Sequence, residues 1–249
     1  MANDMSKLSE KIRRAGQVES APLGFGLGRV REAPASMLCL LRLDKEQSKK
    51  PEASDADAVI LDGVAADKLG SVVRKLGDTP LGLRLEGGDR AAVAAARAAA
   101  VDFVILDAAA SAEALLESGG VGLVLAVDEW GDPELRTLAG LGLDAILVGP
   151  IEEPFTLGRL LELRRLAVLS QTPLLVEVDP KIEASRLETL RESGVLGVIL
   201  DGKSAGKLSA LRRLVLSLPQ RGKRKSEHSD ALLPSLVGAG DYDDDDDDE

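Results

Sequence analysis

Four short apolar segments of nearly the same sequence constrain the fold of this chain more than any other feature. They read DAVILDG at 57–63, DFVILDA at 102–108, DAILVGP at 144–150 and LGVILDG at 196–202. Each is a continuous apolar run that ends in a polar or small residue and precedes a helix-like stretch. A parallel strand that is buried on both faces has this pattern. The repeat therefore predicts an α/β fold with a parallel sheet.

The same reading extends to eight strands alternating with about seven helices. The expected strands are residues 37–43, 58–61, 81–85, 103–106, 122–127, 145–148, 174–178 and 197–200, and the expected helices are 65–76, 89–100, 111–118, 133–141, 156–170, 183–193 and 204–217. The polar segment after the first strand contains a proline, which indicates that a regular first helix is lost or replaced by a loop. This alternation predicts a closed (β/α)8 barrel, with an open doubly wound sheet as the alternative. Closure is favoured because every second strand has a similar sequence, and alternate strands supply the side-chain layers inside a barrel.

Two segments flank the barrel, which is expected to span residues 37–218. Residues 1–36 predict a short amphipathic helix over 6–15 and then an irregular arm, containing Gly and Pro, that covers the barrel floor. Residues 219–249 are first basic (PQRGKRK) and later acidic (DYDDDDDDE). A run of like charges repels itself, so we expect a disordered tail that docks on a basic partner or folds back onto Arg221–Lys225.

Composition excludes several classes of function. The formal net charge is −11, but eight of the last nine residues are acidic, so the remainder of the chain is only mildly acidic. Aromatic residues make up 2%, which leaves few rings for stacking on bases, and we expect no nucleic-acid binding. The apolar runs have strand length, and the charged start MANDMSKLSEKIRRAG lacks an apolar core, so neither a membrane span nor a signal peptide is expected. A single cysteine, Cys39, favours a cytoplasmic protein.

Charged residues recur at matching positions of the odd-numbered strands. The segments LLRLD (40–44), LRLEG (83–87), LAVDE (125–129) and VEVDP (176–180) place at one level Arg42, Arg84, Ala126 and Glu177, and two residues later Asp44, Glu86, Asp128 and Asp179. The opposite face of each strand is wholly apolar and must pack on the helices, so the charged face points into the barrel. We therefore expect two arginines and a glutamate beneath a ring of carboxylates at the C-terminal mouth, where catalytic groups of such barrels lie.

These interior charges have a functional and a structural interpretation. Arg42 and Arg84 would bind a carboxylate or phosphate bidentately, and Glu177 or Asp179 would transfer a proton. The alternative is that Arg42, Arg84 and Glu177 neutralise one another as a structural plug, because ion-pair networks also occur in barrel cores without catalysis.

Carboxylates at the mouth predict a metal site. Glu86, Asp107 and Asp128 follow three successive strands and would supply the oxygen ligands that Mg²⁺ requires. Solvated loop ends give the same pattern. For the acids after the even-numbered strands, Asp62, Asp107 and Asp201, capping of the following helix is the preferred interpretation.

The start of the last helix, DGKSAGK (201–207), suggests an anion site. Lys203, Ser204 and Gly206 lie where helix amides and the helix dipole favour an anion. The loop after the seventh strand, DPKIEAS, contains no glycine, so the usual two-loop phosphate grip is incomplete, and Ser204 as a plain N-cap is the preferred alternative. The only histidine, His228, lies in the tail, which excludes histidine chemistry from the barrel.

The strand repeats and the Gly–Ser start of the last helix resemble the TIM-barrel superfamily over residues 37–218, in particular its phosphate-handling metabolic members. The resemblance extends to no specific family. It implies a cytoplasmic enzyme, of lyase or isomerase type, that acts on a small anionic metabolite by acid/base chemistry. The alternative is a barrel without catalysis that serves as a binding or scaffold protein, because this fold hosts many functions.

Overall fold

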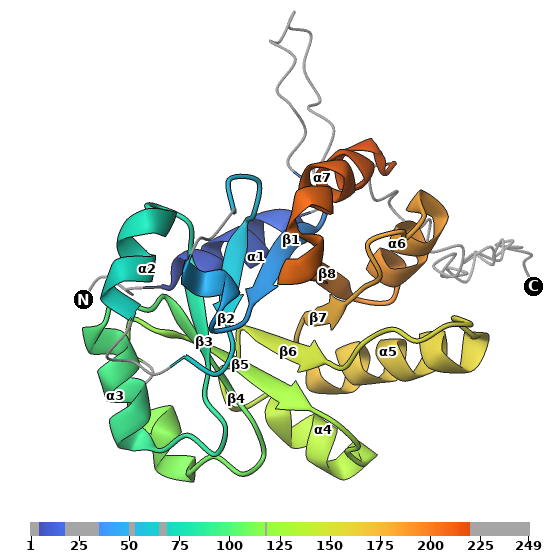
Figure 1. Cartoon of the computed structure of the whole chain (residues 1–249). Coiled ribbons are helices and arrows are strands. Elements are labelled where there is room, and N and C mark those ends of the chain that lie inside the picture. Colours follow the sequence, from blue (N-terminus) through green and yellow to red (C-terminus); the bar gives the residue numbers. More distant parts are fainter. Residues whose placement is uncertain (1–4, 18–34, 50–52, 65–68, 118, 220–249) are drawn as a thin grey trace, which may run out of the picture.

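The computed structural model describes residues 5–17, 35–49, 53–64, 69–117 and 119–219 of the chain, and its strands close into a barrel (Figure 1). All neighbouring strands are parallel, and the last pairs with the first. The strands are β1 (Leu38–Leu43), β2 (Ala58–Leu61), β3 (Leu81–Arg84), β4 (Phe103–Leu106), β5 (Gly122–Val127), β6 (Ala145–Val148), β7 (Leu174–Glu177) and β8 (Val195–Asp201). The predicted (β/α)8 barrel is confirmed, and the open sheet is excluded.

Helices cover the outside of the barrel and connect most of its strands. They are α2 (Leu69–Leu76), α3 (Arg90–Ala98), α4 (Asp132–Leu138), α5 (Leu157–Ser170), α6 (Ala184–Glu192) and α7 (Leu208–Ser217). Between β1 and β2 the described residues form only the 3-10 turn η1 (Gln47–Lys49), in line with the polar sequence there. Among the helices that the structure describes, none has the length and apolar character needed to cross a membrane.

Two expected α-helices begin or form differently. After β4 the chain forms the 3-10 helix η3 (Ala112–Glu117), because the turn after β4 and the glycines at 119 and 120 leave little room before β5. After β8 the expected helix 204–217 is preceded by a second 3-10 segment, η4 (Gly202–Lys207), and the α-helix starts only at Leu208. Glycines at both 202 and 206 disfavour α-helix over this stretch.

An N-terminal helix, α1 (Lys7–Gly16), closes the floor of the barrel (Figure 1). Its apolar face, formed by Leu8, Ile12 and Ala15, is buried among the interior side chains of the strands. The Asp102 carboxylate accepts hydrogen bonds from the amides of Lys7 and Leu8 at 2.7 and 2.9 Å. A negative charge at this end of the helix also interacts favourably with the helix dipole. The helix therefore forms the floor; the arm that we expected there, and the tail from residue 220 on, lie outside the described residues.

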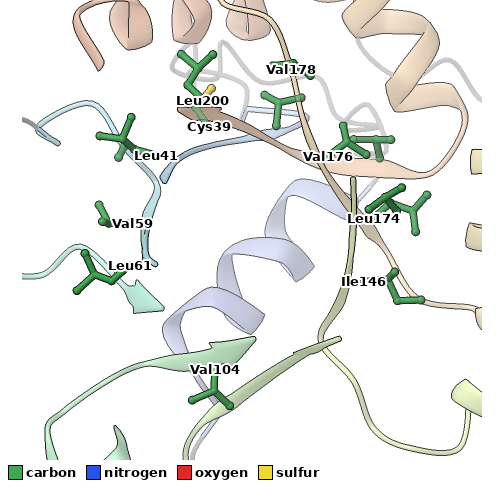
Figure 2. Close-up of a cluster of buried hydrophobic side chains, with 14 of the residues drawn as sticks. Cys39, Leu41, Val59, Leu61, Val104, Ile146, Leu174, Val176, Val178 and Leu200 are labelled. Carbon is green, nitrogen blue, oxygen red and sulfur yellow. The ribbon is translucent and has the colours of Figure 1, made fainter. Parts of the chain in front are cut away.

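The two faces of the strands pack into two separate apolar layers. Outward-facing side chains fill the space between strands and helices, and Figure 2 shows them arranged around the barrel on its outside. Cys39 belongs to this layer; burial raises the pKa of its thiol to about 12, so the thiol stays protonated and unreactive at neutral pH. Inward-facing side chains form a second cluster together with α1, and it includes Leu40, Ile60, Phe103, Ile105 and Ile199.

Phe103 fills the lower part of the barrel because its neighbours on both sides are glycines. It pairs in register with Gly82 on β3 and Gly122 on β5, and it is completely buried. A Cβ atom on Gly82 would lie 2.2 Å from the phenyl ring. The ring thus occupies the space that Gly82 leaves empty, whereas a Cβ atom on Gly122 would meet the Ser6 hydroxyl at 2.6 Å.

Candidate functional site

A cavity of about 220 Å³ lies at the carboxyl end of the barrel. Its floor consists of one aliphatic side chain from each even-numbered strand, namely Ile60, Ile105, Leu147 and Ile199. Its wall consists of one residue from each odd-numbered strand, namely Arg42, Arg84, Ala126 and Glu177. Asp128, Gly149 and Pro150 form the rim. The structure therefore brings together the two arginines and the glutamate that the strand alignment placed at one level.

Small residues on β5 and β6 create this cavity. Ala126 stands at the level where three other strands carry a long charged side chain. Gly149 follows β6 at the position where the other even-numbered strands have Asp62, Asp107 and Asp201. A Cβ atom on Gly149 would have no other atom within 4 Å. The space left by Ala126 and Gly149 is what a ligand could occupy.

Arg42 is held by two carboxylates of the protein itself. Its Nη1 and Nη2 donate hydrogen bonds to Oε2 and Oε1 of Glu177 at 2.8 and 2.9 Å, and Nη2 also donates to Oδ2 of Asp201 at 3.2 Å. The planar guanidinium is suited to this bidentate contact. The arrangement leaves Arg42 little capacity to bind an external anion, and it holds both carboxylate oxygens of Glu177 in a defined orientation.

Arg84 is the arginine that remains available. Its side chain lines the cavity and is 34% exposed. The nearest described carboxylate is Asp62, whose Oδ2 lies 3.9 Å from Nη1, which is too long for a hydrogen bond. The donors of Arg84 can therefore turn to a ligand without breaking a hydrogen bond to a described residue.

Asp201 links β8 to the turn that follows. Its Oδ1 accepts a hydrogen bond from the amide of Lys203 at 2.8 Å, so the predicted capping role of this aspartate is confirmed. That hydrogen bond is the main cause that lowers the pKa of Asp201, with Arg42 adding to it and partial burial opposing it.

We expect Asp201→Asn to destabilise the protein at pH 7 and to have a progressively smaller effect as the pH falls below about 4. Because the pKa of Asp201 is lowered on folding, its carboxylate contributes stability above about pH 4, the ordinary aspartate value, and loses it as the pH falls through the folded pKa. Urea unfolding of both proteins between pH 7 and pH 2.5 measures the difference. A difference that stays constant over this range would show that the side chain acts through packing instead of charge.

Asp179 does not share the cavity with Glu177. Its side chain is exposed, accepts a hydrogen bond from the Lys181 amide at 2.7 Å and lines a separate hollow with Glu153 and Arg186. The strand β7 ends at Glu177, so the alternation that placed Asp179 on the same face no longer holds there. The expected role of Asp179 in proton transfer at this site is therefore not supported by its position.

The predicted magnesium ligands do not converge. Glu86 lies exposed beyond the end of β3, and Asp107 accepts hydrogen bonds from the amides of Gly87 and Ala109 at 3.2 and 2.9 Å, which supports the loop. Only Asp128 lines the cavity. Within the described ranges, no three His, Cys, Asp or Glu side chains are grouped so that they could hold a metal ion. The expectation of a Glu86, Asp107 and Asp128 site is wrong because the side chains lie past the strand ends.

The residues of the predicted anion site at the last helix lie outside the cavity. Lys203, Ser204 and Gly206 lie in η4, and none of them lines the cavity. The carboxylate of Asp201 already occupies the N-terminal end of this turn. Ser204 is not an N-cap either, because α7 begins only at Leu208.

The floor of the cavity was not anticipated, although the sequence carries its signal. Each floor residue is the middle member of the apolar triplet in one of the four repeated segments, VIL in three of them and ILV in the fourth. The repeat was interpreted as a sign of strands only. Its central position also identifies which side chain points inward, since the flanking members belong to the outward layer.

No protein-family model matches the sequence, and no curated protein matches it. Solved structures do match. One is a mutant tryptophan synthase alpha-subunit from Pyrococcus furiosus, with a TM-score of 0.53 and 16% identity over 72% of this chain and 96% of that chain. Another is 3-keto-L-gulonate-6-phosphate decarboxylase from Vibrio cholerae, with a TM-score of 0.60 and 13% identity over 72% of this chain and 97% of that chain. At these identities the likeness shows the fold alone, which is a TIM barrel.

Proposed function

We propose that this protein is a barrel enzyme of small-molecule metabolism whose substrate carries a carboxylate or phosphate group. The observation that carries the proposal is the Arg84 guanidinium, which faces a cavity at the carboxyl end of the barrel without a hydrogen-bonded carboxylate. Catalytic sites of this fold lie at that end. Both structural neighbours described above are metabolic enzymes, which agrees with the proposal.

In this proposal Glu177 transfers the proton and Arg42 positions it. Glu177 lines the cavity, and its two oxygens are fixed by the bidentate contact with Arg42. A fixed carboxylate next to a bound substrate is suited to general acid/base catalysis. Proton transfer without a covalent intermediate corresponds to the lyase or isomerase chemistry that the sequence suggested. Arg42 then acts through Glu177, in place of the anion-binding role expected for it.

A second candidate function is a barrel without catalysis, used for binding or as a scaffold. The bidentate pair of Arg42 and Glu177 favours it, because these two charges neutralise each other without a ligand. An enzyme or a ligand-binding barrel uses Arg84 to bind an anion, whereas a scaffold does not.

Substitution of Arg84 tests this difference. We expect Arg84→Gln to weaken binding of a carboxylate or phosphate ligand by about tenfold to a hundredfold, since hydrogen bonds to charged groups contribute about 1.5–3 kcal/mol. The melting temperature should change little, because Arg84 makes no close contact. Ligands are found by thermal-shift screening of carboxylate and phosphorylated metabolites, and their affinities are measured by calorimetry.

Arg186→Gln is the matched control, because Arg186 lies near the mouth but pairs with Glu153 outside the cavity. It should leave ligand affinity unchanged. If no metabolite stabilises the wild-type protein, or if Arg84→Gln binds as tightly as wild type, the enzyme proposal fails and a structural role of the Arg42–Glu177 pair is the better explanation.

A further inference from the structure

The charges that line the cavity do not all remain available to a ligand. Four charged side chains contribute to it: Arg42, Arg84, Glu177 and Asp128. Arg42 and Glu177 form a bidentate pair with each other. One positive group, Arg84 on β3, and one negative group, Asp128 at the end of β5, are left.

Asp128 is more exposed than Arg84 and has the opposite charge. Its side chain is exposed at the rim, and no described residue donates a hydrogen bond to it or forms an ion pair with it. β4 separates the two strands that carry Arg84 and Asp128, so the two charges face the cavity from different sides of its wall. A ligand that contacts Arg84 in so small a space also lies within the field of Asp128.

A ligand that has only negative charge fits this cavity poorly, because three carboxylates lie near it. Asp62 lies beside Arg84, Asp201 beside Arg42, and Asp128 on the rim. These carboxylates repel an anionic ligand, and they repel a phosphate dianion most strongly. The amide of Lys203, which could bind a phosphate at the turn after β8, already donates to Asp201. The site therefore favours a carboxylate accompanied by a positive charge.

The remaining surface is apolar and the space is small. The floor consists of the four aliphatic side chains of the even-numbered strands, and the volume of about 220 Å³ lies below the range of about 300–1,000 Å³ typical of drug-sized ligands. A short aliphatic chain can fill this floor without leaving a polar group unpaired.

We propose that the ligand is a small zwitterion with an aliphatic chain, as in an aliphatic α-amino acid. Its carboxylate binds Arg84, its ammonium group faces Asp128, and its side chain rests on the floor formed by Ile60, Ile105, Leu147 and Ile199. This assignment rests on the proposed function, since it takes Arg84 as the anion-binding residue, and it adds the second charge and the apolar part.

Three probes with the same carbon chain test the assignment: norvaline, pentanoate, which lacks the ammonium group, and butylamine, which lacks the carboxylate. We expect calorimetry to show that norvaline binds at least about tenfold more tightly than either of the other two. A tenfold difference is about what one hydrogen bond to a charged group contributes to affinity. Arg84→Gln should reduce norvaline binding to the level of butylamine. Asp128→Asn should reduce it to the level of pentanoate and leave pentanoate binding unchanged or stronger.

Asp179→Asn serves as the control, because this exposed carboxylate lies outside the cavity, and it should change none of the affinities. If pentanoate or inorganic phosphate binds as tightly as norvaline and Asp128→Asn has no effect, the zwitterion assignment is wrong while the anion-binding role of Arg84 stands. If neither norvaline, pentanoate nor inorganic phosphate binds the wild-type protein, both the assignment and the proposed function are wrong.

Discussion

Replacing Phe103 with alanine is expected to lower the free energy of unfolding by about 3–5 kcal/mol, the usual cost of deleting a buried phenyl ring. The ring is completely buried inside the barrel, and its neighbours in register are glycines, which have no side chain to fill the space. The surrounding strands are part of a closed sheet and cannot move together without breaking their ladder. Urea unfolding at pH 7 measures the loss, with Phe155→Ala, a partly exposed phenylalanine outside the barrel, as the matched control.

A second substitution shows whether the loss arises from the proposed packing. Gly82→Ala alone should destabilise the protein, because its Cβ atom would lie 2.2 Å from the Phe103 ring. In the Phe103→Ala protein the same methyl group enters vacated space, so it should be neutral or stabilising. The two effects are then strongly non-additive, as expected for residues in contact. Additive losses, or a loss below about 1 kcal/mol for Phe103→Ala, would contradict the packing described for the lower barrel.

Ala126→Leu is expected to abolish ligand binding at the mouth while leaving the protein folded. The side chain at 126 lies in the wall of the cavity, across the barrel from Arg42, and leucine adds three carbon atoms to a space of about 220 Å³. We expect the affinity for any ligand of this cavity to fall at least about a hundredfold, equivalent to about 2.8 kcal/mol. The substituent enters an empty space, so the melting temperature should be close to that of the wild type. Calorimetry with the best ligand from the screen, together with thermal unfolding, measures both quantities.

Ala95→Leu, at an exposed position of α3, is the control for the same chemical change away from the mouth. It should bind the ligand normally. Unchanged binding by Ala126→Leu would show that the ligand site lies elsewhere, for instance in the hollow lined by Asp179 and Arg186. That result would leave the fold untouched but would remove the cavity from consideration.

The strands were predictable because their sequence has a single physical cause. A strand covered on both faces must be apolar throughout, and the segments 58–61, 103–106 and 145–148 match the observed strands at both ends. The 3-10 segment after β4 was not predictable, since helix-forming residues indicate a helix but not whether the available length permits an α-helix. After β8 the glycines at 202 and 206 carried the signal for a later helix start. The role of α1 as the floor was also missed. An amphipathic pattern shows that one helix face is buried but not what it is buried against.

The candidate site was predictable where residues lie within strands and not where they lie beyond them. Arg42, Arg84 and Glu177 face one cavity because the period of two applies up to the last strand residue. Glu86 and Asp179 follow the strand ends, where turn geometry sets the direction of the side chain. The cavity itself was not predicted, because it arises from the small size of Ala126 and Gly149 at positions where the other strands have larger side chains.

The position of α1 determines how molecules reach the interior. With Leu8 and Ile12 inserted from below and Asp102 holding the first turn, the barrel has an opening at one end only. Whatever enters the cavity must leave by the same route, and nothing passes along the barrel axis. For the enzyme proposed above, a product would have to leave before the next substrate enters, and competitive product inhibition would follow.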